Sequence, residues 1–342
     1  METRQMEIKM ETIIKIILIL LAIVFIYFIK EIIALLFIAV IIVSAINPLV
    51  DWLQSKKIPR SIGVLMIYFV LLILISLLIF FLIPPVAMQS AEFAQNFPAY
   101  FQKLENFFVP IEDFFQSNNI NTQQFLENIS SWISDIPKNI LSTTIGVFSG
   151  FILLIAVFSL TFYMSLVKDG VKNFVISVTP QKYQVYAADL TVRIEHKIGR
   201  WLQGQIVLMI AVFLLVYLGL SIIGVPYALV LAFIAGLFEI IPYVGPIISA
   251  VPGIILGFFV SPITGLLAFL VYFVVQEAEN NILVPIIMKR AVGLNPIVII
   301  LVLLIGAKLG GILGAILAVP ITVAVSLMIK DLFFRDKQKS EA

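Results

Sequence analysis

The stretch 239–246, which reads Glu239-Ile240-Ile241-Pro242-Tyr243-Val244-Gly245-Pro246, interrupts a long apolar part of this 342-residue chain. Between Trp201 and Gln276 the only charged residue is Glu239. A run of this length and polarity suits a bilayer rather than a soluble core, and prolines within it break helical hydrogen bonding. A carboxylate beside a broken helix inside a bilayer-length apolar run is typical of a transport site.

The composition of the whole chain supports a membrane protein. Hydrophobic residues make up 61% and charged residues 12%, and the mean hydropathy is +1.12. The net charge of +2 is too small to indicate a nucleic-acid partner, and no cysteine is present for disulfide or thiol chemistry. The sequence contains no zinc-ligand spacing, phosphate-binding loop or nucleophile elbow, so we expect neither an enzyme nor an ATP-driven pump. The lipid bilayer is the first expected partner.

Uncharged apolar runs mark the membrane spans. The runs in the first half are Ile16–Ile29, Ile32–Val50, Ile62–Ile83 ending at Pro84-Pro85, and Asn139–Val167. The expected division is 1–85 for the first three spans, 86–138 for an outer segment of small amphipathic helices, 139–167 for the fourth span, 168–203 for a cytoplasmic amphipathic linker, 204–330 for a transport-type membrane domain with two interrupted repeats, and 331–342 for a cytoplasmic tail. The predicted fold is all-α and polytopic, with about eight transmembrane helices and Pro/Gly-interrupted hairpins in the second half.

Loop charges predict the orientation. Lys and Arg concentrate at both termini, after the second span and after the fourth, whereas the charged residues of segment 86–138 are mainly Asp and Glu. By the positive-inside rule, the N- and C-termini face the cytoplasm and residues 86–138 lie outside.

A weak internal repeat organises the second half. Ten residues separate a proline from a glycine in each unit, each unit reaches a Val-Pro pair, and each has a helix breaker near its middle. These positions are Pro226, Gly236, Val251-Pro252 and Pro242–Pro246 in the first unit, and Pro296, Gly306, Val319-Pro320 and Gly306–Gly311 in the second. One intervening span, Pro262–Leu283, inverts the second unit. Interrupted segments in corresponding places predict a binding site where their tips meet near the midplane. The alternative is two ordinary helical hairpins.

Glu239 is the first candidate site residue. In a helix, Pro242 and Pro246 would free the carbonyls of Phe238 and Pro242. Freed carbonyls beside Glu239 would hold a monovalent cation or a substrate hydroxyl, with Tyr243 and Gly245 in the same break. The alternative is that Glu239 only caps the break.

A polar cluster at the end of the intervening span supplies further candidates. Its members are Gln276, Glu277, Glu279, Asn280 and Asn281. Helical spacing puts Gln276 with Glu279 or Asn280 on one face and Glu277 or Asn281 on another, and one face should point into the protein. Lys308, at the tip of the second unit, would pair with a glutamate or reach water.

Several stretches resemble the signature of the autoinducer-2 exporter family. They are Tyr227-Ala228-Leu229, Glu239 to Pro246, Glu279-Asn280-Asn281-Ile282-Leu283-Val284-Pro285, Gly293-Leu294-Asn295-Pro296, Gly310 to Pro320, and Arg200 to Gln205. The resemblance covers the second half closely and the first half only in layout. It implies a bacterial inner-membrane transporter of eight spans, built as a homo-oligomer. Family members include exporters of autoinducer-2, a quorum-sensing signal, and proteins assigned sodium/proton antiport.

Three functional hypotheses follow. An exporter of a small polar solute would use neutral donors and acceptors, here Gln203, Gln205, Gln276, Asn280 and Asn281. A sodium/proton antiporter would use Glu239 or Glu277 as a carboxylate that alternates between proton and cation. A nontransporting oligomeric scaffold would rely on its outer helices. The expected coupling ion is Na⁺ or H⁺, with no other cofactor or metal, and the interrupted units should move against the first four spans.

Overall fold

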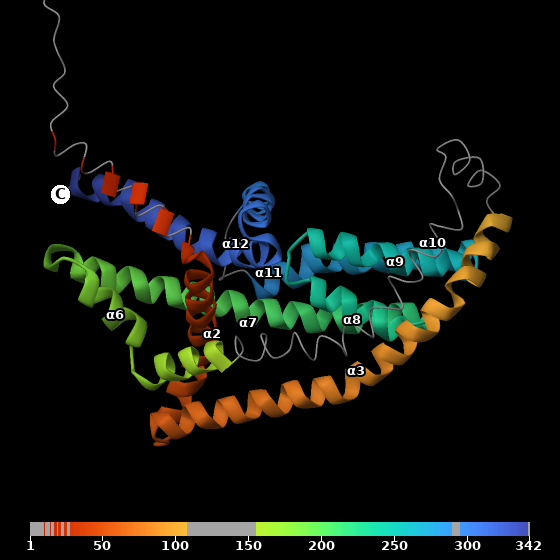
Figure 1. Ribbon diagram of the computed structural model, residues 1–342, viewed down its shortest axis with the longest axis horizontal. Helices are drawn as coiled ribbons and strands as arrows, with labels where there is room; N and C mark the ends of the chain where they lie inside the picture. Colours follow the sequence, from red (N-terminus) through yellow and green to blue (C-terminus); the bar gives the residue numbers. More distant parts are fainter. Residues whose placement is uncertain are drawn as a thin grey trace, which may run out of the picture.

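The computed structural model describes residues 28–107, 155–288 and 295–340, with isolated positions before Phe28, and these residues form helices and short connections without a strand. Within these residues, five helices are long and apolar enough to cross a membrane, and three shorter apolar helices accompany them. The shorter ones are Ile155–Leu166, Ala228–Phe238 and Val244–Val260. The predicted all-α, polytopic membrane fold is therefore confirmed (Figure 1).

The first half contributes α2 (Lys30–Ser55) and α3 (Arg60–Phe107). The apolar, span-length part of α3 ends at Val86, next to the expected end of the third span at Pro84-Pro85, while the helix itself continues to Phe107 along a curved path (Figure 1). A proline inside a formed helix removes one hydrogen bond and bends the axis. The helix can still continue beyond the proline, because no new nucleation step is required there. Part of Ile16–Ile29, residues 108–138 of the outer segment and residues 139–154 of the fourth span lie outside the described residues.

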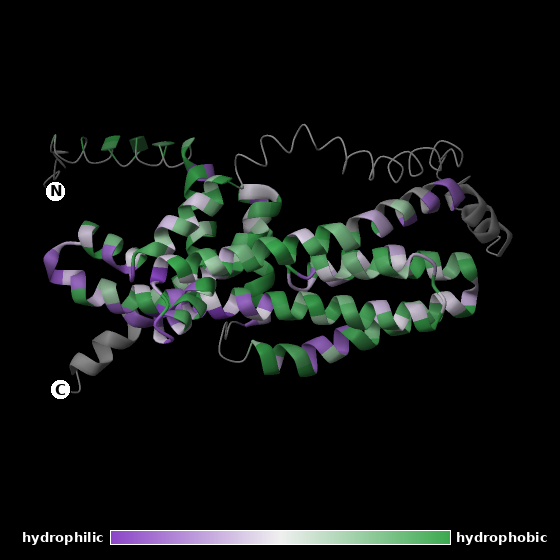
Figure 2. Ribbon diagram, turned by 90° about the horizontal axis from the view of Figure 1, so that it is seen from below, coloured by the Kyte–Doolittle hydropathy of each residue, from purple (hydrophilic) through white to green (hydrophobic). Residues whose placement is uncertain are grey.

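The long helix α7 (Gln184–Ile222) is the framework of the second half. It follows α6 (Gly170–Val178) and the short η1 (Gln181–Tyr183), and it contacts α2, α8, α10 and α12. No break occurs at 203/204, where the linker was expected to give way to the membrane domain. Figure 2 shows hydrophilic residues around α6 and the beginning of α7, and mostly hydrophobic residues along the rest of α7.

The first repeat unit is a helical hairpin made of α8 (Ala228–Phe238) and α9 (Val244–Val260). Its predicted interruption is present, because residues 239–243 form no helix. Next come α10 (Pro262–Ala278), the π-helix η2 (Glu279–Leu283) and the short α11 (Val284–Ile287). Buried side chains of α7, α8, α9 and α10 form one hydrophobic core, so the hairpin packs as a unit on α7 and α10.

The second repeat unit is α12 (Pro296–Ser340), which folds back on itself at Gly310 and Gly311. Its two arms cross so closely that a Cβ on Gly314 would lie 2.1 Å from the Gly306 carbonyl oxygen. A Cβ added at Gly310 or Gly311 would meet no heavy atom of another described residue within 4 Å, whereas the arms of this hairpin share a hydrophobic cluster with Ile241 in the break of the first unit. That the tips of the two units form a site together stays a prediction.

Candidate functional site

The break between α8 and α9 is held by its own backbone hydrogen bonds. The amide of Ile241 donates to the Phe238 carbonyl over 3.0 Å, and the amide of Val244 donates to the Pro242 carbonyl over 2.7 Å. The prediction that these carbonyls are free is therefore wrong. The prolines do remove helical amides, but the chain turns tightly enough for later amides to replace them.

The turn depends on a strained residue followed by a glycine. Tyr243 has φ 64° and ψ −46°, a conformation uncommon for a residue with a side chain. Two residues later, a Cβ on Gly245 would lie 1.8 Å from the carbonyl oxygen of Phe238. The start of α9 therefore packs directly on the end of α8, and only glycine allows that approach. Backbone strain of this kind clusters at functional sites.

Glu239 is the first residue of this turn, directly after α8, and 1% of its surface is exposed. Gln205 of α7, equally buried, donates from Nε2 to the Glu239 main-chain carbonyl over 2.6 Å. The predicted residue Gln205 is thus brought to the site. The side-chain amide of Gln205 binds the main chain of the break at Glu239 and thereby fixes the position of the Glu239 Cα atom, from which the carboxyl side chain extends.

Glu279 reaches the same place from the opposite side. It is buried, it begins the π-helix η2, and its Oε2 accepts from Gln276 Nε2 over 3.2 Å. A π-helix adds a residue to the turn, which rotates the following helix face and is frequent at functional sites. The side chains of Glu279 and Glu239 are both buried and lie close enough to interact electrostatically.

The closeness of Glu239 and Glu279 suits a pair of acids that share a proton. Two carboxylates repel, and a hydrogen bond between carboxyl groups requires that one of them be protonated. Among the described residues, Glu239 Oε2 is buried without a hydrogen-bond donor. An extra proton or a bound cation would satisfy that oxygen. We refer to Glu239 and Glu279 as the acid pair.

The other predicted polar residues lie away from the acid pair. Glu277 and Asn281 are exposed and bond to each other, with 2.8 Å between Asn281 Nδ2 and Glu277 Oε2. Asn280 and Lys308 are also exposed. Gln203 donates to the Ala45 carbonyl over 2.7 Å and so joins α7 to α2. The proposed face of Gln276 and Glu279 does point inward, whereas Glu277, suggested as a titrating acid, points outward.

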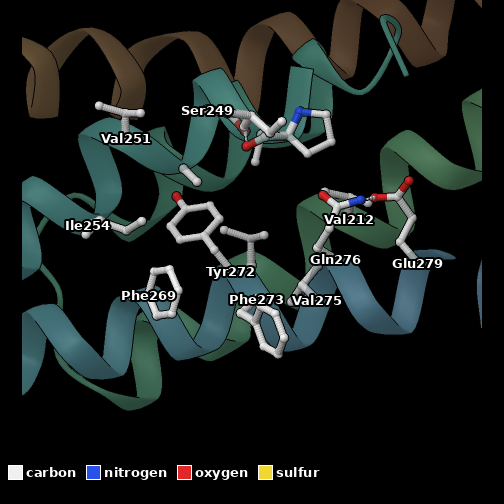
Figure 3. Close-up of a pocket in the computed structure, with 15 residues that line it drawn as sticks. Val212, Ser249, Val251, Ile254, Phe269, Tyr272, Phe273, Val275, Gln276 and Glu279 are labelled. Atoms are coloured by element: carbon white, nitrogen blue, oxygen red, sulfur yellow. Dashed lines mark hydrogen bonds between the residues drawn. The ribbon is translucent and has the colours of Figure 1, made fainter. Parts of the chain in front are cut away.

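A cavity of about 320 Å³ adjoins the acid pair between α7, α8, α9 and α10 (Figure 3). Glu279 and Gln276 stand at one end, and Pro246 contributes to the wall. Sequence reasoning did not place Ser249 or Tyr272 in the site, although both are buried and line this cavity. Isolated serine and tyrosine residues are common in apolar helices, so no sequence pattern indicated that these two are site residues.

Comparison with known proteins places the chain among transporters. A model of AI-2E family transporters matches residues 16–333. YueF of Bacillus subtilis, a candidate transport protein, is 30% identical over 295 residues, covering 83% of this chain and 79% of YueF. YrrI of the same organism, likewise a candidate transport protein, is 25% identical over 305 residues, covering 88% and 86%. A sodium-lithium/proton antiporter of Halobacillus andaensis is 25% identical over 324 residues, covering 86% of this chain and 88% of that protein.

Proposed function

The chain belongs to the AI-2E transporter family, and on that premise we propose that it exchanges a monovalent cation for a proton through the acid pair. It is a membrane transporter, as the family match and the apolar helices establish. The observation that carries the finer proposal is the burial of two acidic side chains, Glu239 and Glu279, close to each other in the membrane domain. Charged side chains inside a membrane domain are costly and mark ion pathways and proton relays.

The chemistry of exchange follows from that contact. With one shared proton, the acid pair carries a single negative charge, and Gln276 and Gln205 hold its two halves in place. A monovalent cation that enters between the carboxyl groups replaces the proton, so the two carboxylates with their cation again carry a single net negative charge. The proton leaves, and reprotonation from the other side releases the cation. Each state of the pair therefore binds either the proton or the cation, as antiport requires.

The identity of the cation is proposed from chemistry and likeness together. Carboxylate and carbonyl oxygens are the ligands of hard cations. The relative from Halobacillus andaensis is named a sodium-lithium/proton antiporter, which supports Na⁺ or Li⁺ as the exchanged ion for this chain as well. In this proposal Na⁺ or Li⁺ and the proton are themselves the transported substrates, and no further coupling ion is needed.

Export of a small polar solute such as autoinducer-2 is the second candidate. It is supported by the family description and by the cavity that Gln276, Glu279 and Ser249 line. Most of the cavity wall is apolar, and three of the five amides expected to bind such a solute, Gln203, Asn280 and Asn281, lie elsewhere. The geometry therefore favours cation exchange.

The setting of this activity is also a proposal. We place the chain in a bacterial inner membrane with both termini in the cytoplasm and several copies assembled together. The α8–α9 hairpin would move against the first four spans to expose the acid pair to each side in turn. Its strained turn at Tyr243 and its glycine contact at Gly245 support a hairpin that has more than one packing arrangement.

Proton movement in proteoliposomes tests the proposal. An imposed Na⁺ gradient should drive a pH change inside vesicles that contain the protein. Glu239→Gln and Glu279→Gln should each abolish it, because an amide cannot exchange a proton. Glu277→Gln is the matched control, since that acid lies exposed on the same stretch, and it should retain the flux. Solute efflux without a sodium-driven pH change would favour export, and no flux of either kind would favour the scaffold.

A further inference from the structure

The cavity beside the acid pair has a size and a lining that an inorganic cation does not need. Its volume of about 320 Å³ reaches the lower end of the range of small-molecule pockets, roughly 300 to 1,000 Å³. A bare sodium ion would be bound by oxygen atoms at short range, whereas this wall is built mainly from apolar side chains such as Val212, Ala250 and Ile254. The lining therefore favours an occupant with an apolar body.

The charge at the end of the cavity selects the sign of that occupant. Glu279 is the only charged side chain among the described residues that line it, and it belongs to the acid pair with its single negative charge. No lysine or arginine in that lining neutralises it. We propose that the cavity binds small monovalent organic cations that combine an ammonium group with an apolar arm. This inference rests on the proposed function, because it names a further substrate class for the same acid pair.

Aromatic side chains in the wall suit such a ligand. Phe269, Tyr272 and Phe273 of α10 all line the cavity (Figure 3). Aromatic faces attract ammonium groups and are the usual means by which proteins recognise quaternary ammonium compounds. An apolar arm would lie along the valines and isoleucines while the ammonium group approaches Glu279.

An unpaired hydroxyl gives independent evidence for a ligand. Tyr272 is 8% exposed, and within the described part of the chain its hydroxyl is buried without a hydrogen-bond partner. Figure 3 shows this hydroxyl directed across the cavity toward α9. A buried polar group without a partner costs about 1–3 kcal/mol in a folded protein. A cation in the cavity would meet the oxygen of that hydroxyl and recover part of the cost.

The rim of the cavity indicates how a ligand enters. Ile247, Val251 and Phe269 line it and are 68%, 51% and 54% exposed in the single chain. An apolar rim on a membrane protein faces lipid, where amphipathic cations accumulate. The ligand would therefore enter from the bilayer with its apolar arm against the rim and its charge directed inward.

Equilibrium binding tests this inference without any ion gradient. The purified full chain is titrated in detergent with benzyltrimethylammonium, with phenylmethanesulfonate, which has a similar shape and the opposite charge, and with tetramethylammonium, which has no aromatic arm. We expect saturable binding of benzyltrimethylammonium that is at least about tenfold tighter than that of the other two ions. Equal affinities for the cation and the sulfonate, or no saturable binding, would overturn the inference.

Three variants locate the bound cation. Glu279→Gln should weaken benzyltrimethylammonium binding by about tenfold or more, because the charge is lost at nearly constant shape. Ala250→Phe should abolish binding by filling the wall, and thermal unfolding shows whether that variant is folded. Glu277→Gln should bind like the parent protein. Unchanged affinity in Glu279→Gln would contradict the assignment.

The same titrations separate this inference from the proposed function. If sodium drives proton flux but the organic cation does not bind, the cavity assignment fails and the antiport proposal stands. If the organic cation binds with the expected charge preference but sodium drives no flux, the antiport of inorganic cations fails and the cavity assignment stands.

Discussion

Replacing Gly245 by alanine should push apart the end of α8 and the beginning of α9, which pack directly on each other in the first hairpin. The added Cβ would lie 1.8 Å from the Phe238 carbonyl oxygen and 2.5 Å from its carbonyl carbon, whereas real Cβ atoms essentially never approach closer than 3.0 Å. The end of α8 must therefore move by more than an ångström relative to α9. Glu239 follows Phe238 directly, so its carboxyl group moves away from Glu279.

The size of the effect follows from that displacement. Overpacking a tight contact costs about 1–3 kcal/mol of stability. A misplacement of about 1 Å at a reacting group costs roughly a hundredfold in rate, and we expect a loss of this order in sodium-driven proton flux. Gly310→Ala is the matched control. Gly310 lies at the break of the second hairpin, has φ −137°, and an alanine Cβ there would have no heavy atom of another described residue within 4 Å.

Flux in proteoliposomes and thermal unfolding in detergent would be measured for both glycine variants. We expect slow flux and a lowered unfolding temperature for Gly245→Ala, with nearly normal behaviour for Gly310→Ala. Parental flux in a folded Gly245→Ala protein would refute the reasoning, because it would show that the packing of α8 on α9 does not position the acid pair.

Other substitutions test the supports around the site. Gln205→Leu removes the buried amide that bonds the Glu239 carbonyl, so the protein should lose about 1–3 kcal/mol of stability in thermal or denaturant unfolding. Gly199→Ala places a Cβ 2.2 Å from an α2 carbonyl oxygen and should destabilise the α2–α7 contact by about 1–3 kcal/mol, visible as a lower unfolding temperature. Asp331→Asn weakens the paired hydrogen bonds from Arg193 that join α7 to α12. Because both side chains are partly exposed, its cost should be about 1 kcal/mol or less, and salt should reduce the difference from the parent protein.

Much of the helical layout was predictable because apolar length and helix breakers act locally. The interruption between α8 and α9 was expected from Pro242 and Pro246, and the inward face of Gln276 and Glu279 was expected from helical spacing. The burial of Glu239 could be anticipated as well, since it stands alone in an apolar run.

The parts that failed depend on contacts between distant segments or on small changes of helical geometry. The closeness of Glu239 to Glu279 brings together the break of the first hairpin and the end of the intervening span, which are far apart in the sequence, and the π-helix that starts at Glu279 has no clear sequence signal. The continuation of α3 as one helix beyond the span end at Pro84-Pro85 was not predicted, because the sequence does not show whether a proline ends a helix or only bends it. Gln203 looked like a site residue because the sequence does not show that its α7 face meets α2.

Infrared difference spectroscopy on sodium addition addresses the shared proton most directly. The parent protein should lose the carbonyl absorption of a protonated carboxylic acid when Na⁺ binds. That band should disappear from the difference spectrum in both Glu239→Gln and Glu279→Gln, and it should persist in Glu277→Gln. A difference spectrum that lacks the band in the parent, or that keeps it in both acid-pair variants, would contradict the shared-proton mechanism.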